Sequence, residues 1–182
     1  MAQLVLTAIG DDREGLVSSL AEQIDAHGGN WQESALSHLA GKFAGVVLVE
    51  VPGDRVEGLT SALAELEQSV GLRVDVTDAR DQGGPTGDGD AAEARSRTLT
   101  LQLIGQDRTG MVHDVTSTIA SFGASIEDLR TRTADAPEGG GVLFMAEALV
   151  HLPAEGDEAE VRDALEKIAA ELMVDLDLDD AF

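Results

Sequence analysis

The chain has 182 residues, of which 43% are hydrophobic and 26% charged, a composition typical of a folded globular protein rather than a disordered one. It contains no cysteine, which excludes disulfides and thiolate sites, and its net charge of −23 leaves no cationic surface for direct binding to nucleic acid or to acidic membranes. No apolar run approaches the roughly 18–20 residues that cross a bilayer, and the N-terminus lacks the pattern of a secretory signal, so we expect a cytoplasmic protein.

The first half of the chain alternates between the periodicities of strands and helices. Leu4, Leu6 and Ala8 recur at every second position, whereas Leu16, Leu20 and Ile24 recur at every fourth. The patterns predict, in chain order, a strand at residues 4–8, a helix at 16–27, a strand from residue 30, a strand at 43–51, a helix at 56–70 and a strand at 72–76.

Residues 79–96 differ in composition from the regions on either side. They are rich in Gly, Asp and Pro, which cannot sustain a regular element. The stretch has no Gly-Lys-Ser or Gly-Lys-Thr sequence, which argues against a phosphate-binding loop. We therefore predict a linker at 79–96 between modules at 1–78 and 97–182.

The second half repeats the first. The segment from Ile9 to Val17 recurs from Ile104 to Val112, with six of nine positions identical, and Pro52 matches Pro153 after six extra residues in the loop at 137–141. The patterns predict strands at 98–103, from 125, at 142–152 and at 173–178, with helices at 111–122 and 161–172. We thus expect an α+β protein with two ferredoxin-like βαββαβ modules in tandem, each with sheet order 4-1-3-2.

The turn between the first strand and the first helix is the most similar segment of the two copies. Asp12 and Asp107 are predicted to be N-caps, and Gly15 and Gly110 to lie in the first helical turn, where glycine is a poor helix former. Free N–H groups at a helix start favour an anion, so a small anionic or zwitterionic ligand fits this turn. The alternative is that Asp and Gly only shape a tight turn.

These residues carry a resemblance to a known family. The pattern Asp-Arg-x-Gly-(Leu/Met)-Val, followed by Gly-Gly-Asn-Trp or Gly-Ala-Ser-Ile at the second strand, resembles the ACT domain. Two such modules and nothing else, with Leu39-Ala40-Gly41-Lys42-Phe43-Ala44-Gly45 in the first, are similar to the group of glycine cleavage system transcriptional repressors.

The resemblance implies that amino acids or related metabolites bind where two modules meet, through the strand-to-helix loop and the start of the second strand. Carried over by position, the ligand-binding residues are Asp12, Arg13, Gly15, Leu16, Asn30, Asp107, Arg108, Gly110, Met111 and Ser125. The family often has asparagine where Ser125 stands and proline where Glu14 and Thr109 stand. We expect the first module to bind more strongly, because serine reaches less far than Asn30.

No constellation of catalytic residues emerges from the sequence. The four histidines form no close metal-ligand pair, and there is no Gly-x-Ser-x-Gly nucleophile elbow. Asp175, Asp177 and Asp179 alternate with leucines, which is typical of the outward face of a strand. The sequence thus indicates a protein without catalytic, metal or cofactor sites.

The sequence favours a non-catalytic regulator that responds to a small amino acid, with glycine as the candidate. It is expected to modulate transcription of the glycine cleavage type through contacts with a DNA-binding regulator. Two alternatives stay open: a regulatory subunit of an amino-acid or one-carbon metabolic enzyme, and an assembly module without ligand. A homodimer is compatible with each of them.

Overall fold

The computed structural model describes residues 1–79, 97–137, 140–153 and 157–180, and the chain divides into two compact units, Met1–Thr86 and Gly87–Phe182. The division falls inside the predicted linker, which lies outside the described residues from position 80 to position 96. The exact bounds of that linker stay a prediction.

The first unit has the predicted βαββαβ order. Its elements are β1 (Ala2–Asp11), α1 (Leu16–Ala26), β2 (Asn30–Leu39), β3 (Lys42–Val51), a short 3-10 helix η1 (Gly53–Arg55), α2 (Val56–Ser69) and β4 (Leu72–Asp78). They correspond closely to the predicted ranges, because the apolar periodicity that marks each element is also the face that it buries.

The second unit repeats this order. Its elements are β5 (Arg97–Gln106), α4 (Met111–Ser121), β6 (Ser125–Asp135), β7 (Val142–Leu152), α5 (Glu158–Leu172) and β8 (Val174–Asp180). The extra residues of this copy lengthen the β6–β7 hairpin, whose strands have 11 residues each against 10 in β2 and β3.

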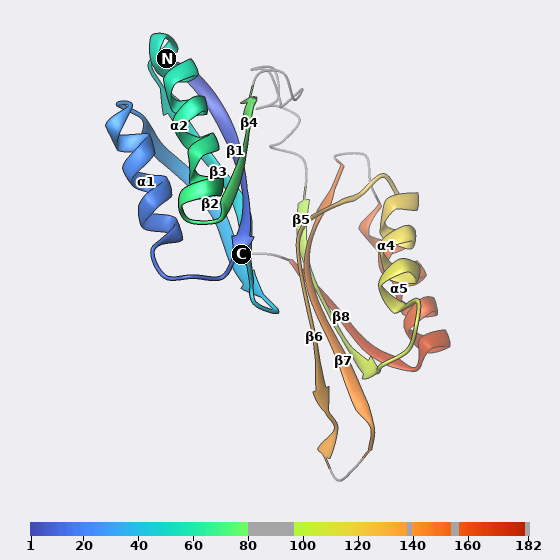
Figure 1. The fold of residues 1–182 in the computed structure, drawn as a ribbon. Helices are drawn as coiled ribbons and strands as arrows, with labels where there is room; N and C mark the ends of the chain where they lie inside the picture. Colours follow the sequence, from blue (N-terminus) through green and yellow to red (C-terminus); the bar gives the residue numbers. More distant parts are fainter. Residues whose placement is uncertain (80–96, 138–139, 154–156, 181–182) are drawn as a thin grey trace. The chain divides into compact units, whose positions relative to one another are not determined.

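Each sheet is antiparallel, with order β2-β3-β1-β4 in the first unit and β6-β7-β5-β8 in the second, so the predicted 4-1-3-2 order is confirmed. Within each unit both helices cover the same face of the sheet (Figure 1). None of the helices in the described ranges is long and apolar enough to cross a membrane.

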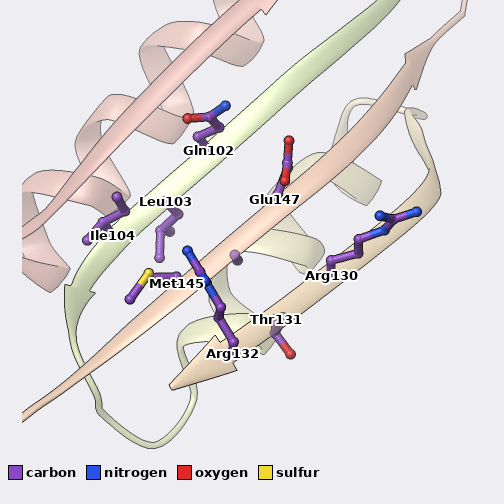
Figure 2. Close-up of a pocket in the computed structure, with 9 residues that line it drawn as sticks. Gln102, Leu103, Ile104, Arg130, Thr131, Arg132, Met145 and Glu147 are labelled. Carbon is purple, nitrogen blue, oxygen red and sulfur yellow. The ribbon is translucent and has the colours of Figure 1, made fainter. Parts of the chain in front are cut away.

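The other face of each sheet points away from the helices of its own unit. In the second unit this face includes Gln102 and Ile104 from β5, Met145 and Glu147 from β7, and Arg132 from β6 (Figure 2). Ile104 is 45% exposed there. This face is therefore mixed in character, with apolar and charged side chains interleaved.

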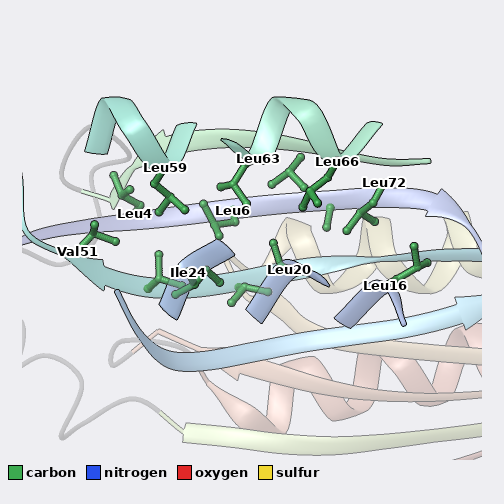
Figure 3. Packing of buried hydrophobic residues seen from close by; sticks show 14 of the residues in the cluster. Leu4, Leu6, Leu16, Leu20, Ile24, Val51, Leu59, Leu63, Leu66 and Leu72 are labelled. Carbon is green, nitrogen blue, oxygen red and sulfur yellow. The ribbon is translucent and has the colours of Figure 1, made fainter. Parts of the chain in front are cut away.

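The core of the first unit lies between the sheet and the two helices. Leu6, Leu20, Leu59 and Leu63 are completely buried in it, and leucine and isoleucine side chains from α1, α2, β1 and β4 interdigitate (Figure 3). The second unit has a separate core of the same kind around Leu99, Leu103, Ile119 and Leu165. Each module therefore buries its own core, as expected for an independent folding unit.

Candidate functional site

The loop between the first strand and the first helix of each module ends in a glycine with left-handed backbone. Gly15 has φ 88° and Gly110 has φ 97°, a region that L side chains rarely adopt. In both modules this glycine is the N-cap: its carbonyl accepts the first helical hydrogen bond, from the N–H of Ser19 (2.8 Å) and of Asp114 (2.9 Å). The repeated glycine therefore marks the point where each helix begins.

The expectation that Asp12 and Asp107 cap the helices is wrong. Neither side chain accepts a hydrogen bond from the helix start, because the left-handed glycine places that start three residues further along the chain. Instead, the backbone N–H of Asp12 donates to the carbonyl of Gly41 at 3.0 Å, and that of Asp107 donates to Val142 at 2.9 Å. These bonds hold each loop against the neighbouring hairpin, and both carboxylates stay exposed.

The first turn of α1 presents unpaired backbone donors. In the described part of the chain, no group accepts from the N–H of Leu16, Val17 or Ser18, and no side chain caps this helix. Such donors, together with the positive end of the helix dipole, form a binding site for anionic groups. The helix start can therefore bind a carboxylate.

A hollow of about 410 Å³ lies next to this helix start. It is lined by the predicted residues Asp12, Arg13, Gly15 and Leu16, by the next two residues of α1, and by His38 and Phe43 from the β2–β3 hairpin. Sequence reasoning did not select His38 and Phe43. His38 and Phe43 are direct partners across the β2–β3 hairpin, and Phe43 pairs with Gly10 near the end of β1. This pairing brings both residues next to the loop that follows β1.

Asn30 lies at the other end of the same sheet. It pairs with Glu50, which pairs with Gln3 at the start of β1, whereas the loop follows Asp11 at the end of that strand. Eight residues of extended strand separate the two positions, about 27 Å at roughly 3.4 Å per residue. A single module therefore does not bring Asn30 to the loop.

The second module arranges its predicted residues in the same way. Asp107, Arg108, Gly110 and Met111 share the β5–α4 loop, and Ser125 starts β6 at the far end of the sheet, paired with His151. In each module the predicted loop residues therefore lie close together. The predicted residue of the second strand, Asn30 or Ser125, lies at the other end of the sheet.

The two loops differ in one backbone donor. In the second module the N–H of Arg108 donates to the sulfur of Met111 at 3.3 Å. Leu16 replaces this methionine in the first module, and within residues 1–79 no group accepts from the N–H of Arg13. The first loop therefore offers a ligand one donor more than the second.

Charges of both signs lie beside the first loop. The carboxylate of Asp11 accepts a hydrogen bond from Lys42 and lies 4.0 Å from the guanidinium of Arg13. The bond from Lys42, followed by the charge of Lys42 and then that of Arg13, lowers the pKa of Asp11 below its usual value. All three side chains are more than half exposed, so this cluster is screened by water.

The glycine that precedes each loop has a packing role. A Cβ on Gly10 would lie 2.5 Å from the carbonyl oxygen of Gly71, and one on Gly105 would lie 2.2 Å from the side chain of Val174. The two neighbouring strands approach too closely there for any side chain. This explains the repetition of Gly10 as Gly105 without any role in ligand binding.

Within the described ranges, no three His, Asp or Glu side chains come together in a group that could hold a metal ion. The Nδ1–H of His27 donates a 2.8 Å hydrogen bond to the carbonyl of Gln23, and Phe122 occupies the matching position at the end of α4. His27 therefore caps the C-terminal end of α1.

Comparisons with known proteins agree with this architecture. Residues 2–77 match the model of one ACT domain family, and residues 99–170 match that of another. The chain is 23% identical, over 93% of its length and 85% of the relative, to the glycine cleavage system transcriptional repressor of Escherichia coli (strain K12).

Two solved structures match nearly the whole chain. An unknown protein from Galdieria sulphuraria has 29% identity and a TM-score of 0.83, with 100% of this chain and 99% of that chain covered. A putative glycine cleavage system transcriptional repressor has 16% identity and a TM-score of 0.71, with 99% and 97% covered, and its likeness concerns the fold alone. The matches to both halves show that the chain belongs to the ACT-domain family and consists of two ACT domains in tandem.

Proposed function

We propose that the chain is a non-catalytic regulator that binds a small amino acid, with glycine as the first candidate, at the β1–α1 loop of its first module. The observation that carries this proposal is the uncapped start of α1, whose free N–H groups border a hollow lined by Asp12 and Arg13. Membership of the ACT-domain family, and similarity to a transcriptional repressor over 93% of the chain, support a regulatory role rather than catalysis.

The chemistry of the loop suits a zwitterion. The N–H groups of Leu16, Val17 and Ser18 can donate to a carboxylate, and the exposed carboxylate of Asp12 can accept from an ammonium group. Asp12 is available for this role, because it neither caps the helix nor forms an ion pair among the described residues. An α-amino acid carries its ammonium and carboxylate groups on one carbon atom and would therefore bridge the two sides of the loop.

The predicted preference for the first module has a structural reason that does not depend on Asn30 and Ser125, which lie at the far end of each sheet. The N–H of Arg108 is already bonded to Met111, whereas that of Arg13 is open. The second loop therefore presents fewer donors to a ligand, and we expect it to bind more weakly.

Regulation of transcription would proceed through another protein. Both modules are acidic: residues 1–78 hold 4 basic and 13 acidic side chains, and residues 97–182 hold 6 and 18. A surface of this charge repels the DNA backbone, so the proposed partner is a DNA-binding regulator.

A thermal-shift screen of the common amino acids on the full chain tests the binding proposal. A ligand present at 100 times its Kd adds about 2.7 kcal/mol to the stability of the folded state, which gives a clear rise in Tm. We expect glycine or another small amino acid to raise the Tm of the wild type, and the Asp12→Asn variant to lose most of that rise.

Asp107→Asn is the matched control, because it makes the same change in the weaker loop, and it should keep most of the rise. A rise that is equal in all three proteins would contradict the proposed role of Asp12. If no amino acid changes the Tm of the wild type, the ligand-free assembly module is favoured, and co-purification with a catalytic polypeptide would favour an enzyme's regulatory subunit.

A further inference from the structure

The second sheet carries charges of opposite sign at its two edges, on the face that points away from its helices. Its edge strands are β6 and β8. β6 contributes Arg130 and Arg132 to this face, and β8 contributes Asp175 and Asp177. All four side chains are exposed.

The pairing register arranges these residues in two rows that cross all four strands. The first row is Arg132, Met145, Ile104 and Asp175, and the second row is Arg130, Glu147, Gln102 and Asp177. Directly paired residues of an antiparallel sheet point to the same face, so each row is continuous on this surface. Each row begins with an arginine and ends with an aspartate.

The two ends of a row cannot neutralise each other. Three strand spacings of about 4.8 Å separate them, roughly 14 Å in all. Among the described residues, none forms an ion pair with Arg132, Asp175 or Asp177, whereas Arg130 bonds to Asp128 on its own strand at 3.1 Å. Arg132 lies beside Met145, while the guanidinium of Arg130 points away from it (Figure 2).

The centre of the face is partly apolar and hollowed. Ile104 is 45% exposed, Met145 is half-buried, and both border a hollow of about 290 Å³ that residues of both rows line. Exposed apolar side chains between charged groups are typical of a surface that another protein covers, since interfaces place a drier centre inside a polar rim.

We infer that this face of the second module binds the same face of a second copy of the chain, about a two-fold axis that runs parallel to the strands between β5 and β7. This rotation places β6 of one copy over β8 of the other. Arg132 then faces the partner's Asp175, and Arg130 faces the partner's Asp177. Sheets pack about 10 Å apart, a gap that an arginine and an aspartate span together.

The same rotation also matches the central strands. β7 lies over β5 of the other copy, so Met145 packs against the partner's Ile104, and Glu147 accepts a hydrogen bond from the partner's Gln102. A two-fold axis perpendicular to the strands would instead place β6 over β6 of the partner. Arginine side chains of the two copies would then face and repel each other. The distribution of charge therefore selects one of the two face-to-face arrangements.

The size of the face sets the strength of the contact. Four strands about 4.8 Å apart and seven residues of about 3.4 Å give roughly 450 Å² on each copy. This lies at the low end of specific interfaces, so the dimer should be reversible and dependent on concentration.

Sedimentation velocity of the full chain over a concentration series tests the inference. The wild type should show a monomer–dimer equilibrium, and Arg132→Glu and Asp175→Arg should each weaken dimerisation at least tenfold, because each places like charges opposite each other at two symmetric positions. Lys167→Glu and Asp163→Arg, matched changes on the exposed side of α5, should leave the equilibrium unchanged.

A mixture of Arg132→Glu and Asp175→Arg tests the proposed pairing of these two positions directly. Glu at position 132 of one variant would face Arg at position 175 of the other, and Asp175 of the first would face Arg132 of the second. A heterodimer should therefore form, detected by native mass spectrometry with one variant isotopically labelled, after circular dichroism has shown both to be folded. A wild type that stays monomeric, a variant that dimerises as well as the wild type, or the absence of the heterodimer would each overturn the inference.

Discussion

The ion pair between Asp11 and Lys42 joins the last residue of β1 to the first residue of β3, directly before the candidate ligand loop. Because the pKa of Asp11 is lowered in the folded state, the interaction stabilises the fold above the unfolded pKa of about 3.9, and this contribution is lost as the pH falls through the lower folded value.

We predict that Lys42→Met raises the pKa of Asp11 toward its usual value, because the main hydrogen bond and the nearest positive charge are both removed. A carboxyl titration followed by NMR measures this pKa. Arg13→Met is the control and should raise it less, since Arg13 is the smaller cause. An Asp11 pKa that is unchanged in Lys42→Met would refute the assignment of the cause.

Met173 ends α5 with φ 55°, in the left-handed region, where Gly71 with φ 74° ends the corresponding turn of the first module. The sequence predicted that Met173 begins the last strand, and this is wrong: β8 begins at Val174. Methionine fits the apolar pattern of a strand, and its sequence neighbourhood contains no glycine to signal a left-handed helix end.

We predict that Met173→Gly stabilises the chain by about 1 kcal/mol, because glycine adopts this conformation without the cost that an L side chain bears. Denaturation by urea measures the change. The side chain of Met173 is 74% exposed, so little packing is lost. Gly71→Ala should act in the opposite direction by a similar amount, and a destabilised Met173→Gly would contradict the backbone explanation.

The helices begin in two different ways, and the sequence predicted only part of this difference. Asp157 is a true N-cap: it precedes α5 and its carboxylate accepts from the N–H of Ala159 at 2.9 Å. Asp107 was predicted to play this role for α4, but Gly110 does so instead. An aspartate before an apolar helical pattern signals a nearby start, and the left-handed turn at Gly110 decides where the helix actually begins.

We therefore predict that Asp157→Ala costs about 0.5–2 kcal/mol, the range for loss of an N-cap, whereas Asp107→Ala changes stability by less than about 0.5 kcal/mol. Thermal or chemical unfolding of the two variants provides the comparison. Equal destabilisation by both would mean that the carboxylate of Asp107 supports its helix after all.

At the level of elements, the apolar periodicities were sufficient to predict the strands and helices, and the ferredoxin-like βαββαβ order then predicted the strand order of both sheets. Strands such as Leu99–Leu103 show a single buried face, which fixes their type and orientation. The candidate site was harder to predict. The loop residues are neighbours in sequence and stay neighbours in space, but Asn30 is related to them only through the family resemblance, and the direction of β2 carries it to the far end of the sheet.

For the molecule as a whole, the charge of −23 leads to a prediction about DNA. We expect the purified chain to show no specific DNA affinity, because no cluster of Lys and Arg is available to displace the counterions of the phosphates. Gel shifts at several salt concentrations measure this. A shift by the pure chain that weakens steeply with salt would contradict the proposal that it acts through a protein partner.

The proposed ligand site is best tested at the glycine that starts each helix. Gly15→Val, the obvious bulky change, is unsuitable: a Cβ there would meet nothing within 4 Å, but the φ of 88° strains a β-branched residue and threatens the loop itself. Asparagine tolerates left-handed backbone better than other side chains, so Gly15→Asn adds bulk beside the free N–H groups with less strain. Gly110→Asn makes the same change in the second module.

Titration calorimetry of the full-length wild type, Gly15→Asn and Gly110→Asn with glycine measures the central claim most directly. If the β1–α1 loop of the first module binds the amino acid, the wild type takes up ligand, Gly15→Asn loses its affinity at least tenfold, and Gly110→Asn keeps most of it. Equal uptake by all three proteins, with all three folded, would show that the repeated loop is only a structural turn.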